Sequence, residues 1–198
     1  MLLDVDQLPA ITTDRLRLRW LTPDDVPALF GIFGDPDVCR YWSRPALANV
    51  AAAAALQQEI VQLFAERSLF QWGIAEKESN RVIGTCTLAG LSSQHKRAEI
   101  GFALARNSWG HGYVTEAVTA LLAFAFDTLQ LHRIEADADP RNHRSIAVLE
   151  RVGFEQEGYL RERYHLNGEV QDALFYGLLR SDFARPQQKS PAESPGFS

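Results

Sequence analysis

The sequence has few cysteines, no excess of basic residues and no long hydrophobic run. Its 198 residues include two cysteines, Cys39 and Cys86, too few for a disulfide framework or a four-ligand zinc site. The 25 Asp and Glu residues outnumber the 20 Lys and Arg residues, and the net charge of −5 argues against nucleic-acid binding through phosphates. The most apolar stretch, residues 117–126, is about half a membrane span. We therefore expect neither a membrane protein nor a disulfide-stabilised secreted domain.

The first residues do not have the pattern expected of a secretory signal. The first six residues carry Asp4 and Asp6 where a signal peptide needs lysine or arginine. The two cysteines are expected to be reduced, which is typical of proteins in the cytosol. We therefore expect a cytoplasmic protein.

The composition is that of a folded domain, with 46% hydrophobic and 23% charged residues. Residues 185–198 differ from the rest, because they contain three prolines and three serines. Such a segment buries too little apolar surface to offset its ordering entropy. The sequence predicts one domain over residues 1–184 and a disordered tail over residues 185–198.

Strands and helices are mixed along the predicted domain rather than strictly alternating, which argues against a doubly wound nucleotide-binding fold. Four helices are expected, one after Thr22-Pro23, one after the alanine run 51–55, and two over Thr115–Leu129 and Asn142–Val152. Periodicity and turn residues predict seven strands, over residues 15–20, 70–75, 82–91, 98–105, 134–138, 157–166 and 170–179.

A loop with two glycines, residues 109–115, connects a predicted strand to a predicted helix. Unpaired N–H groups at a helix start bind phosphate-sized anions, and Gly110 and Gly112 let the backbone approach such a ligand closely. An ordinary strand-to-helix turn has the same pattern, and neither GxxxxGK[ST] nor GxGxxG is present. The loop alone therefore does not identify a binding site.

A second informative segment, residues 139–154, surrounds the last predicted helix. Asn142 stands where that helix begins and is a natural N-cap, and Ser145 is placed to bond locally. Gly153 is a typical helix terminator, after which Phe154 returns to the core. These roles are structural when the segment is considered alone.

Together the two segments resemble the GCN5-related N-acetyltransferase (GNAT) superfamily, and within it the RimJ/RimL-type branch. The family loop pattern, Gln/Arg-x-x-Gly-x-Gly/Ala, aligns with Trp109, Gly112 and Val114. This sequence departs from the pattern at its first and last positions. The tryptophan in WGHGY is itself similar to the RimJ/RimL-type branch. The resemblance extends to residues 13–19, to the strand 98–102 and to the run from Asn142 to Phe154.

This resemblance implies an α/β GNAT fold, a mixed, splayed sheet of about seven strands flanked by about four helices. Acetyl-CoA would lie between the fourth and fifth strands, its pantetheine arm adding to the strand edge and its pyrophosphate on the N–H groups of Gly110 to Thr115. The implied cofactor-binding residues are Phe102, Leu104, Trp109, Gly110, His111, Gly112, Tyr113, Val114, Thr115, Asn142 and Ser145.

Acetyl transfer to an amine needs a neutral amine, a stabilised oxyanion and a donor for the departing thiolate. Many members supply the donor from a helical tyrosine, whose position here is Leu149. Ser145 is the first replacement candidate, although it also suits a local backbone bond. Tyr164 is the second, with core packing as its alternative role.

Glu99 is the first candidate for the general base, because it is an acid within an otherwise apolar strand. Its alternative role is an ion pair with Arg97 or Arg81. Glu135 is a weaker candidate, and ordered water could replace a single base. The five histidines lack metal-ligand spacing, so no metal site is expected, although His111 could contact a phosphate.

The leading interpretation is acetyl-CoA-dependent transfer to a protein N-terminal α-amine, as in ribosomal-protein-alanine acetyltransferases. The alternatives are a small amine acceptor, such as an antibiotic or a polyamine, and a non-catalytic acyl-CoA sensor, which the leucine at 149 favours. The expected partners are acetyl-CoA and an amine acceptor, without nucleic acid or membrane, and a homodimer is left open. Candidate residues for the acceptor side are Trp20, Tyr41, Trp42 and Arg44.

Overall fold

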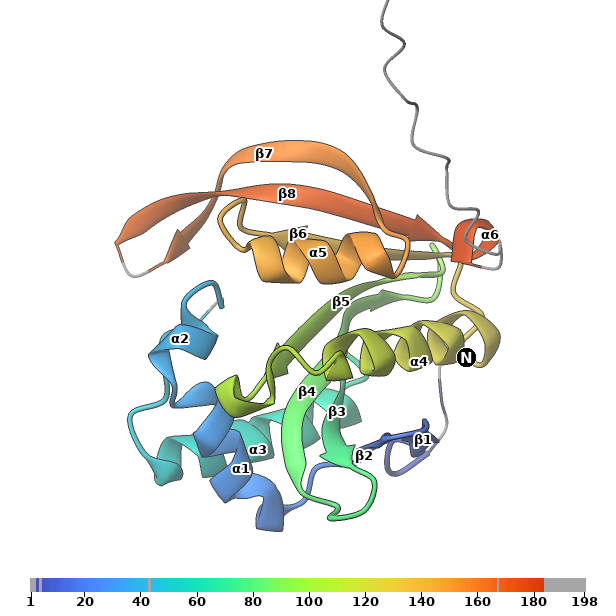
Figure 1. Ribbon diagram of the computed structural model, residues 1–198. Coiled ribbons are helices and arrows are strands. Elements are labelled where there is room, and N and C mark those ends of the chain that lie inside the picture. Colours follow the sequence, from blue (N-terminus) through green and yellow to red (C-terminus); the bar gives the residue numbers. More distant parts are fainter. Residues whose placement is uncertain (1–2, 4, 43, 167, 184–198) are drawn as a thin grey trace, which may run out of the picture.

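Eight strands form one mixed sheet in the computed structural model, which describes residues 3, 5–42, 44–166 and 168–183 (Figure 1). The predicted disordered tail, 185–198, lies outside these residues. The strands are β1 (Ile11–Thr12), β2 (Leu16–Arg19), β3 (Leu69–Glu76), β4 (Val82–Ser92), β5 (Arg97–Leu104), β6 (Arg133–Ala138), β7 (Glu155–Leu166) and β8 (Glu169–Leu179). The seven predicted strands are all found, and β1 is the addition.

The order of strands in the sheet is β1-β2-β3-β4-β5-β6-β8-β7. Every neighbouring pair is antiparallel except β5 and β6, which run parallel. A parallel pair needs a crossover, and α4 (Tyr113–Asp127) provides it between β5 and β6. The mixed sheet predicted from the sequence is therefore confirmed.

Four helices match the predicted ones, and two short helices are additional. The Asp35 side chain caps one of these, α2, by accepting the N–H of Asp37 at 2.8 Å. The helices besides α4 are α1 (Val26–Phe33), α2 (Pro36–Cys39), α3 (Val50–Ala65), α5 (His143–Arg151) and α6 (Arg180–Phe183), with 3-10 turns η1 (Pro23–Asp25) and η2 (Arg106–Ser108).

The two faces of the sheet carry different helices (Figure 1). We call them the α3 face, which α1 and α3 cover, and the α4 face, which α4 and α5 cover. The α3 face holds a small core that includes Leu29, Ile60 and Ala103. The α4 face holds the larger core, in which Trp72 and Leu121 are fully buried. Side chains alternate between the two faces along β5, so Gly101 and Glu99 lie on the same face as Ala103, the α3 face.

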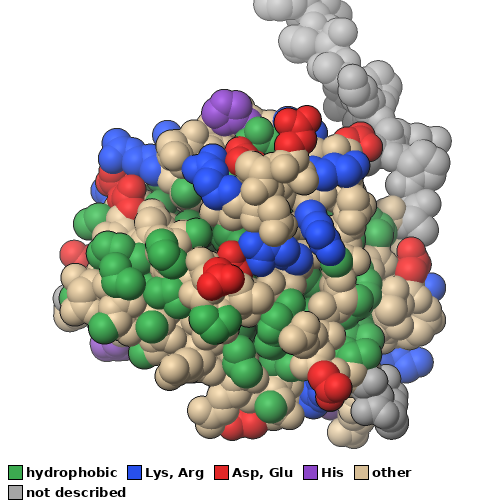
Figure 2. All heavy atoms as spheres, turned by 90° about the horizontal axis from the view of Figure 1, so that it is seen from below, with side chains coloured by type: hydrophobic (Ala, Val, Ile, Leu, Met, Phe, Trp, Pro, Cys, Tyr) green, Lys and Arg blue, Asp and Glu red, His purple; other side chains and the backbone are tan. Residues whose placement is uncertain are grey.

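The surface seen from below carries basic and acidic side chains close together, with hydrophobic side chains scattered between them (Figure 2). Single exposed hydrophobic side chains are ordinary on protein surfaces. The molecule's exposed hydrophobic side chains include Val61 on α3, whose exposed fraction is 39%. We assign no site to this face.

Candidate active site

The sheet opens between β5 and β6. These strands pair only over Arg97–Glu99 and Arg133–Glu135, whereas β5 continues to pair with β4 as far as Leu104. Figure 1 shows the two strands diverging from this short paired segment. The edge of β5 that faces β6 is therefore without a partner strand beyond Glu99.

The register determines which backbone groups of β5 face this opening. The N–H of Ala105 donates to the Ile83 carbonyl at 2.8 Å, so Gly84 and Leu104 form a non-hydrogen-bonded pair. By alternation, the backbone groups of Phe102 and Leu104 point away from β4 and into the opening. These are the two residues at which the sequence predicts pantetheine binding, and an extended ligand can pair with such an edge as an added strand does.

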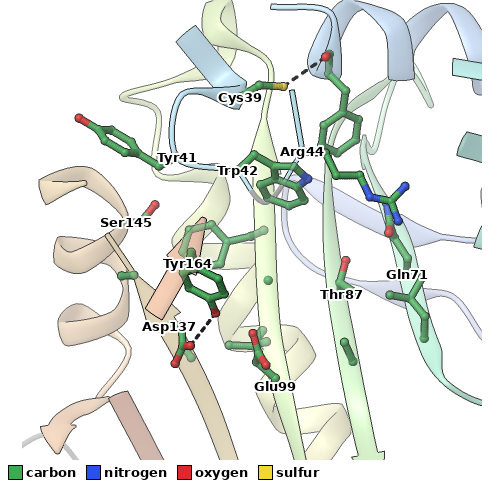
Figure 3. A pocket seen from close by; sticks show the side chains of 18 of the residues that line it. Cys39, Tyr41, Trp42, Arg44, Gln71, Thr87, Glu99, Asp137, Ser145 and Tyr164 are labelled. Atoms are coloured by element: carbon green, nitrogen blue, oxygen red, sulfur yellow. Dashed lines mark hydrogen bonds between the residues drawn. The ribbon is translucent and has the colours of Figure 1, made fainter. Parts of the chain in front are cut away.

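A cavity of about 530 Å³ begins at this opening (Figure 3). Its lining includes Glu99 and Gly101 from the α3 face and also Ile100 and Phe102 from the other face of β5. Successive strand residues point to opposite faces, so the cavity passes through the sheet. It connects the α3 side to Ser145 on α5.

Glu99 projects into this cavity without a partner. Among the described residues it makes neither a hydrogen bond nor an ion pair. The expected alternative partners are engaged elsewhere, since Arg97 contacts Glu135 at 2.5 Å and Arg81 contacts Glu76 at 3.2 Å. Glu99 is exposed to the cavity, and its partial desolvation there, followed by the nearby Asp137 carboxylate, raises its pKa above the ordinary value. An ion-pair role for Glu99 is therefore wrong for the described part of the chain.

Tyr164 lies near Glu99 and donates its hydroxyl proton to Asp137 Oδ2 at 2.7 Å (Figure 3). The pairing of β7 with β8 is irregular between Leu160 and Tyr164. Such bulges redirect side chains next to functional sites. Burial and the Asp137 carboxylate raise the pKa of Tyr164 to about 12. The phenol therefore stays protonated at neutral pH and is held by Asp137.

Ser145 lines the cavity from the first turn of α5. Asn142 is the N-cap of this helix, as predicted, and its Oδ1 accepts the N–H of Ser145 at 3.3 Å. The Ser145 hydroxyl has no hydrogen-bond partner among the described residues. Leu149, one turn further along α5, lines the same cavity and is buried. Ser145 is thus a hydroxyl that α5 presents to the cavity, one turn before Leu149.

The glycine loop runs from η2 to α4. Gly110 and Gly112 have φ angles of +80° and +76°, in the left-handed region that favours glycine. The first helical bond of α4 joins the Glu116 N–H to the Gly112 carbonyl at 3.1 Å. The N–H groups before it, at positions 113–115, have no acceptor one turn earlier in the helix, which is the geometry of an anion site.

Trp109 links this loop to the opening in the sheet. Its indole N–H donates to the Leu104 carbonyl at 2.8 Å, and the Arg144 guanidinium lies over its ring at 4.6 Å from the centroid. Arg144 has no ion-pair partner among the residues described. The tryptophan that replaces the family's Gln/Arg therefore holds a guanidinium beside the loop.

The start of α4 is fixed by Glu116. This carboxylate accepts hydrogen bonds from the Thr13 hydroxyl at 2.6 Å and from the Arg15 backbone N–H at 2.9 Å and Nε at 2.7 Å. Arg15 also donates to the His111 carbonyl at 3.0 Å. The similarity of residues 13–19 to the family thus has a physical reason, because they hold the loop in place.

The other predicted residues lie in several places. Tyr41, Trp42 and Arg44 line the cavity, but Trp20 does not, since it packs on Phe64 at a centroid distance of 5.0 Å. His111 is exposed and stacks on Tyr113 at 5.6 Å. Tyr113 and Val114 also pack against the larger core, and Thr115 is half-buried. Glu135 is held by Arg97 and Arg133 and is not a free carboxylate.

Several polar residues of the cavity were not predicted from the sequence, among them Gln71, Thr87 and Asp137. Gln71 and Thr87 are direct cross-strand partners, so their side chains lie on the same face. Asp137 follows Glu135 by two residues and could have been placed on its face by strand periodicity. Nothing local marks Gln71 or Thr87, because their position depends on the register of β3 and β4.

Both cysteines are buried and free, and the Cys39 thiol donates to the Phe33 carbonyl at 3.2 Å. Across the described ranges, no three His, Cys, Asp or Glu side chains are grouped to hold a metal ion. In the same ranges, no helix has the length and apolar character needed to cross a membrane.

Comparison with known proteins gives the class of this chain. Residues 15–155 match the family described as acetyltransferase (GNAT) domain. "Uncharacterized N-acetyltransferase p20" of Bacillus licheniformis is 35% identical over 177 residues, covering 89% of this chain and 99% of that protein. A solved acetyltransferase of the GNAT family from Bacillus anthracis has a TM-score of 0.78 and 24% identity, over 86% of this chain and 98% of that one, and shows the same fold.

The chain therefore belongs to the GNAT family and is an N-acetyltransferase. The predicted family and fold class are confirmed, and the chain is an enzyme rather than a non-catalytic sensor. GNAT acetyltransferases use acetyl-CoA and an amine acceptor. The opened strand edge and the glycine loop are compatible with acetyl-CoA, because the edge has no partner strand beyond Glu99 and the loop carries no Cβ at Gly110 or Gly112.

Proposed function

We propose that this acetyltransferase acetylates protein N-terminal α-amines, with Glu99 as the general base. The observation that carries the proposal is Glu99, the one unpaired carboxylate among the described residues of a cavity that passes through the sheet to α5. Glu99 would accept a proton from the attacking amine, and a backbone N–H near Phe102 would stabilise the oxyanion. Acetyl-CoA supplies the activated acetyl group as a thioester.

An α-amine fits a carboxylate base better than an alkylamine does. The pKa of an α-amine is about 7.7–8.0, against about 10.4 for a lysine-type amine. A large part of an α-amine is therefore neutral near pH 7.5, and Glu99 has only to accept the proton that this amine loses as it attacks the thioester. An alkylamine would be almost fully protonated at that pH.

Several relatives support an N-terminal acceptor. "[Ribosomal protein uS5]-alanine N-acetyltransferase" of Escherichia coli is 28% identical over 117 residues, 59% of this chain and 60% of that protein. The RimJ/RimL-like assignment is part of this proposal. So is a cytoplasmic location, for which the free, buried cysteines give support. A homodimer stays a prediction.

A small-amine acceptor is the second candidate. "Spermidine N(1)-acetyltransferase" of Vibrio cholerae is 24% identical over 169 residues, and the cavity has several acidic side chains that would attract a polycation. Most of them are engaged, however, since Asp137 contacts Arg163 at 3.2 Å and Asp139 contacts Arg141 at 2.7 Å. A cavity with one free carboxylate suits an acceptor with one ammonium group better than a polyamine with several.

We further propose how acetyl-CoA lies on this chain. The backbone of Phe102 and Leu104 would pair with the pantetheine arm, and the N–H groups from Gly110 to Thr115 would bind the pyrophosphate. Trp109, His111, Tyr113 and Val114 belong to this loop, and Asn142 with Ser145 would lie near the sulfur. Arg144, stacked on Trp109, would add a cation beside the phosphates.

The acceptor class is tested with a peptide that has a free α-amine and one internal lysine. We expect mass spectrometry to find acetyl on the α-amine alone, and spermidine to react at least tenfold more slowly in kcat/KM. Acetylation of spermidine or of the lysine, with the α-amine left free, would contradict the proposed acceptor.

Ser145 is expected to stabilise the departing thiolate. A thiol has a pKa near 8.5, so its thiolate needs only a hydrogen-bond donor. We expect Ser145→Ala to lower kcat roughly 10–100-fold with little change in acetyl-CoA affinity, as for loss of one transition-state donor. Steady-state kinetics and titration calorimetry give the two quantities.

Tyr164→Phe is the paired variant, because Tyr164 is the rival donor. Its proton is held by Asp137 and its pKa is about 12, so we expect kcat to stay within about threefold of the wild type. The reverse order of effects would move the donor role to Tyr164. No effect in either variant would mean that solvent protonates the sulfur.

A further inference from the structure

The cavity has an apolar wall opposite its polar wall, and no part of the proposed chemistry uses it. The apolar wall consists of Trp42, Leu47, Leu56 and Leu63. Each of these side chains is only half-buried, so apolar surface remains uncovered inside the cavity. Leu56 and Leu63 are two turns apart on α3 and therefore share one face of that helix.

The apolar wall is held in place by contacts around it. Trp42 packs on Phe33 at a centroid distance of 5.3 Å. The Arg44 guanidinium binds the Glu59 carboxylate through both nitrogens, at 2.6 and 2.7 Å, and so ties the segment after α2 to α3. In Figure 3, Trp42 and Arg44 lie across the cavity from Glu99 and Asp137.

The polar wall contains two side chains that lack partners. Gln71 and Thr87 have exposed fractions of 7% and 8% and line the cavity from neighbouring strands (Figure 3). Neither side chain makes a hydrogen bond to any described residue. Their polar atoms reach the cavity and are free to bind a ligand there, so this pair suits a ligand with amide-like donors and acceptors.

We infer that the acceptor is a peptide whose first residue has a large apolar side chain. The ammonium group would lie at Glu99, the first peptide group at Gln71 and Thr87, and the side chain on the apolar wall. This inference rests on the proposed function and names its substrate class. A cavity of about 530 Å³ is the size of a small-molecule pocket, so it takes the end of a chain rather than a folded surface.

The inference is tested with peptides that differ only in their first residue, which is Leu, Ala or Asn. Leucine and asparagine have similar shapes, so their comparison isolates polarity. We expect kcat/KM to be 10–100-fold higher for the Leu peptide than for the Ala peptide, and lowest for Asn. Equal or higher values for Ala or Asn would overturn the inference while the proposed α-amine activity stands.

Two variants on α3 locate the effect. Leu56→Ala is expected to reduce the Leu-over-Ala preference at least fivefold, because it removes part of the apolar wall. Val61→Ala removes an exposed side chain from the same helix and should leave the preference unchanged. If both variants behave alike, the preference does not come from the apolar wall and the inference is wrong.

Simple amines separate this inference from the proposed function. If no peptide is acetylated but 3-methylbutylamine reacts faster than ethylamine, the proposed peptide acceptor is wrong. The peptide part of the inference falls with it, and only a preference for apolar amines survives. Leucine amide should react faster than 3-methylbutylamine, partly because its amine has the lower pKa, and that part is the same for every variant. If Gln71→Leu reduces the difference at least fivefold, the peptide-group contact is supported. A difference that is unchanged in Gln71→Leu would contradict it.

Discussion

Replacing Gly112 with aspartate is expected to raise the dissociation constant of acetyl-CoA about 100-fold, whereas asparagine raises it only about tenfold. Both side chains would occupy the space that a phosphate needs at the start of α4. Only aspartate adds a negative charge there. The tenfold difference corresponds to about 1.4 kcal/mol, within the range of about 1 to 4 kcal/mol for two unit charges 4 Å apart near a protein surface.

Neither variant is expected to unfold the protein. Gly112 has a φ of +76°, a conformation that Asp and Asn tolerate better than other side chains. A Cβ at this position would meet only Arg15 Nη2, at an ordinary 3.6 Å. A negative charge near a helix N-terminus is also favourable.

The measurement is titration calorimetry with acetyl-CoA at fixed ionic strength, together with a thermal melt of each variant. Arg15 is already paired with Glu116, so it screens a new carboxylate only in part. Equal dissociation constants for the Asp and Asn variants, with unchanged melting temperatures, would show that no phosphate lies against this loop.

Glu99→Gln is expected to lower kcat roughly 100- to 1,000-fold, the usual effect of losing a general base. The affinity for acetyl-CoA should stay within about threefold, because Glu99 lies on the acceptor side of the cavity. Initial rates over a range of pH provide the sharper readout. The wild-type kcat/KM should rise with pH through two ionisations, those of Glu99 and of the acceptor amine, and the variant should retain only the second.

The same substitution should not destabilise the protein. The pKa of Glu99 is raised in the folded state, so the stability that its protonated form contributes is present at low pH. That stability is lost as pH rises through the folded pKa. Glutamine cannot ionise, and Glu99→Gln is therefore expected to melt at or above the wild-type temperature at pH 7.5.

Glu135→Gln is the matched control, because Glu135 is the direct register partner of Glu99 on β6. Its carboxylate is held by Arg97 and Arg133, so the variant should lose some stability but keep both ionisations in its pH profile. The pH profile of Glu135→Gln should shift slightly toward lower pH, because Glu135 helps to raise the pKa of Glu99. Loss of the first ionisation in this variant would transfer the base role to Glu135.

Local patterns in the sequence were enough to predict most of the secondary structure and the loop. The alternation of residues 15–20, the N-cap at Asn142 and the two glycines at 110 and 112 each act over a few neighbouring residues. Caps, turns and periodicity depend on such short distances, and the structure has these elements where they were predicted. The short helix α2 was missed because four residues give too little periodicity to detect.

The tertiary structure alone decided which polar groups are free. Arg97 stands two residues from Glu99 on the same strand face, yet it binds Glu135, 38 residues away, because the register of β5 and β6 brings that carboxylate nearer. The pairing of β5 with β6 ends after Glu99, and the sheet is therefore open at Phe102 and Leu104. Strand register is set by packing over the whole sheet, and no short stretch of sequence contains it. The sequence therefore determined the family, the elements and the glycine loop, while the fold decided that Glu99 is unpaired and that the cavity has one polar and one apolar wall.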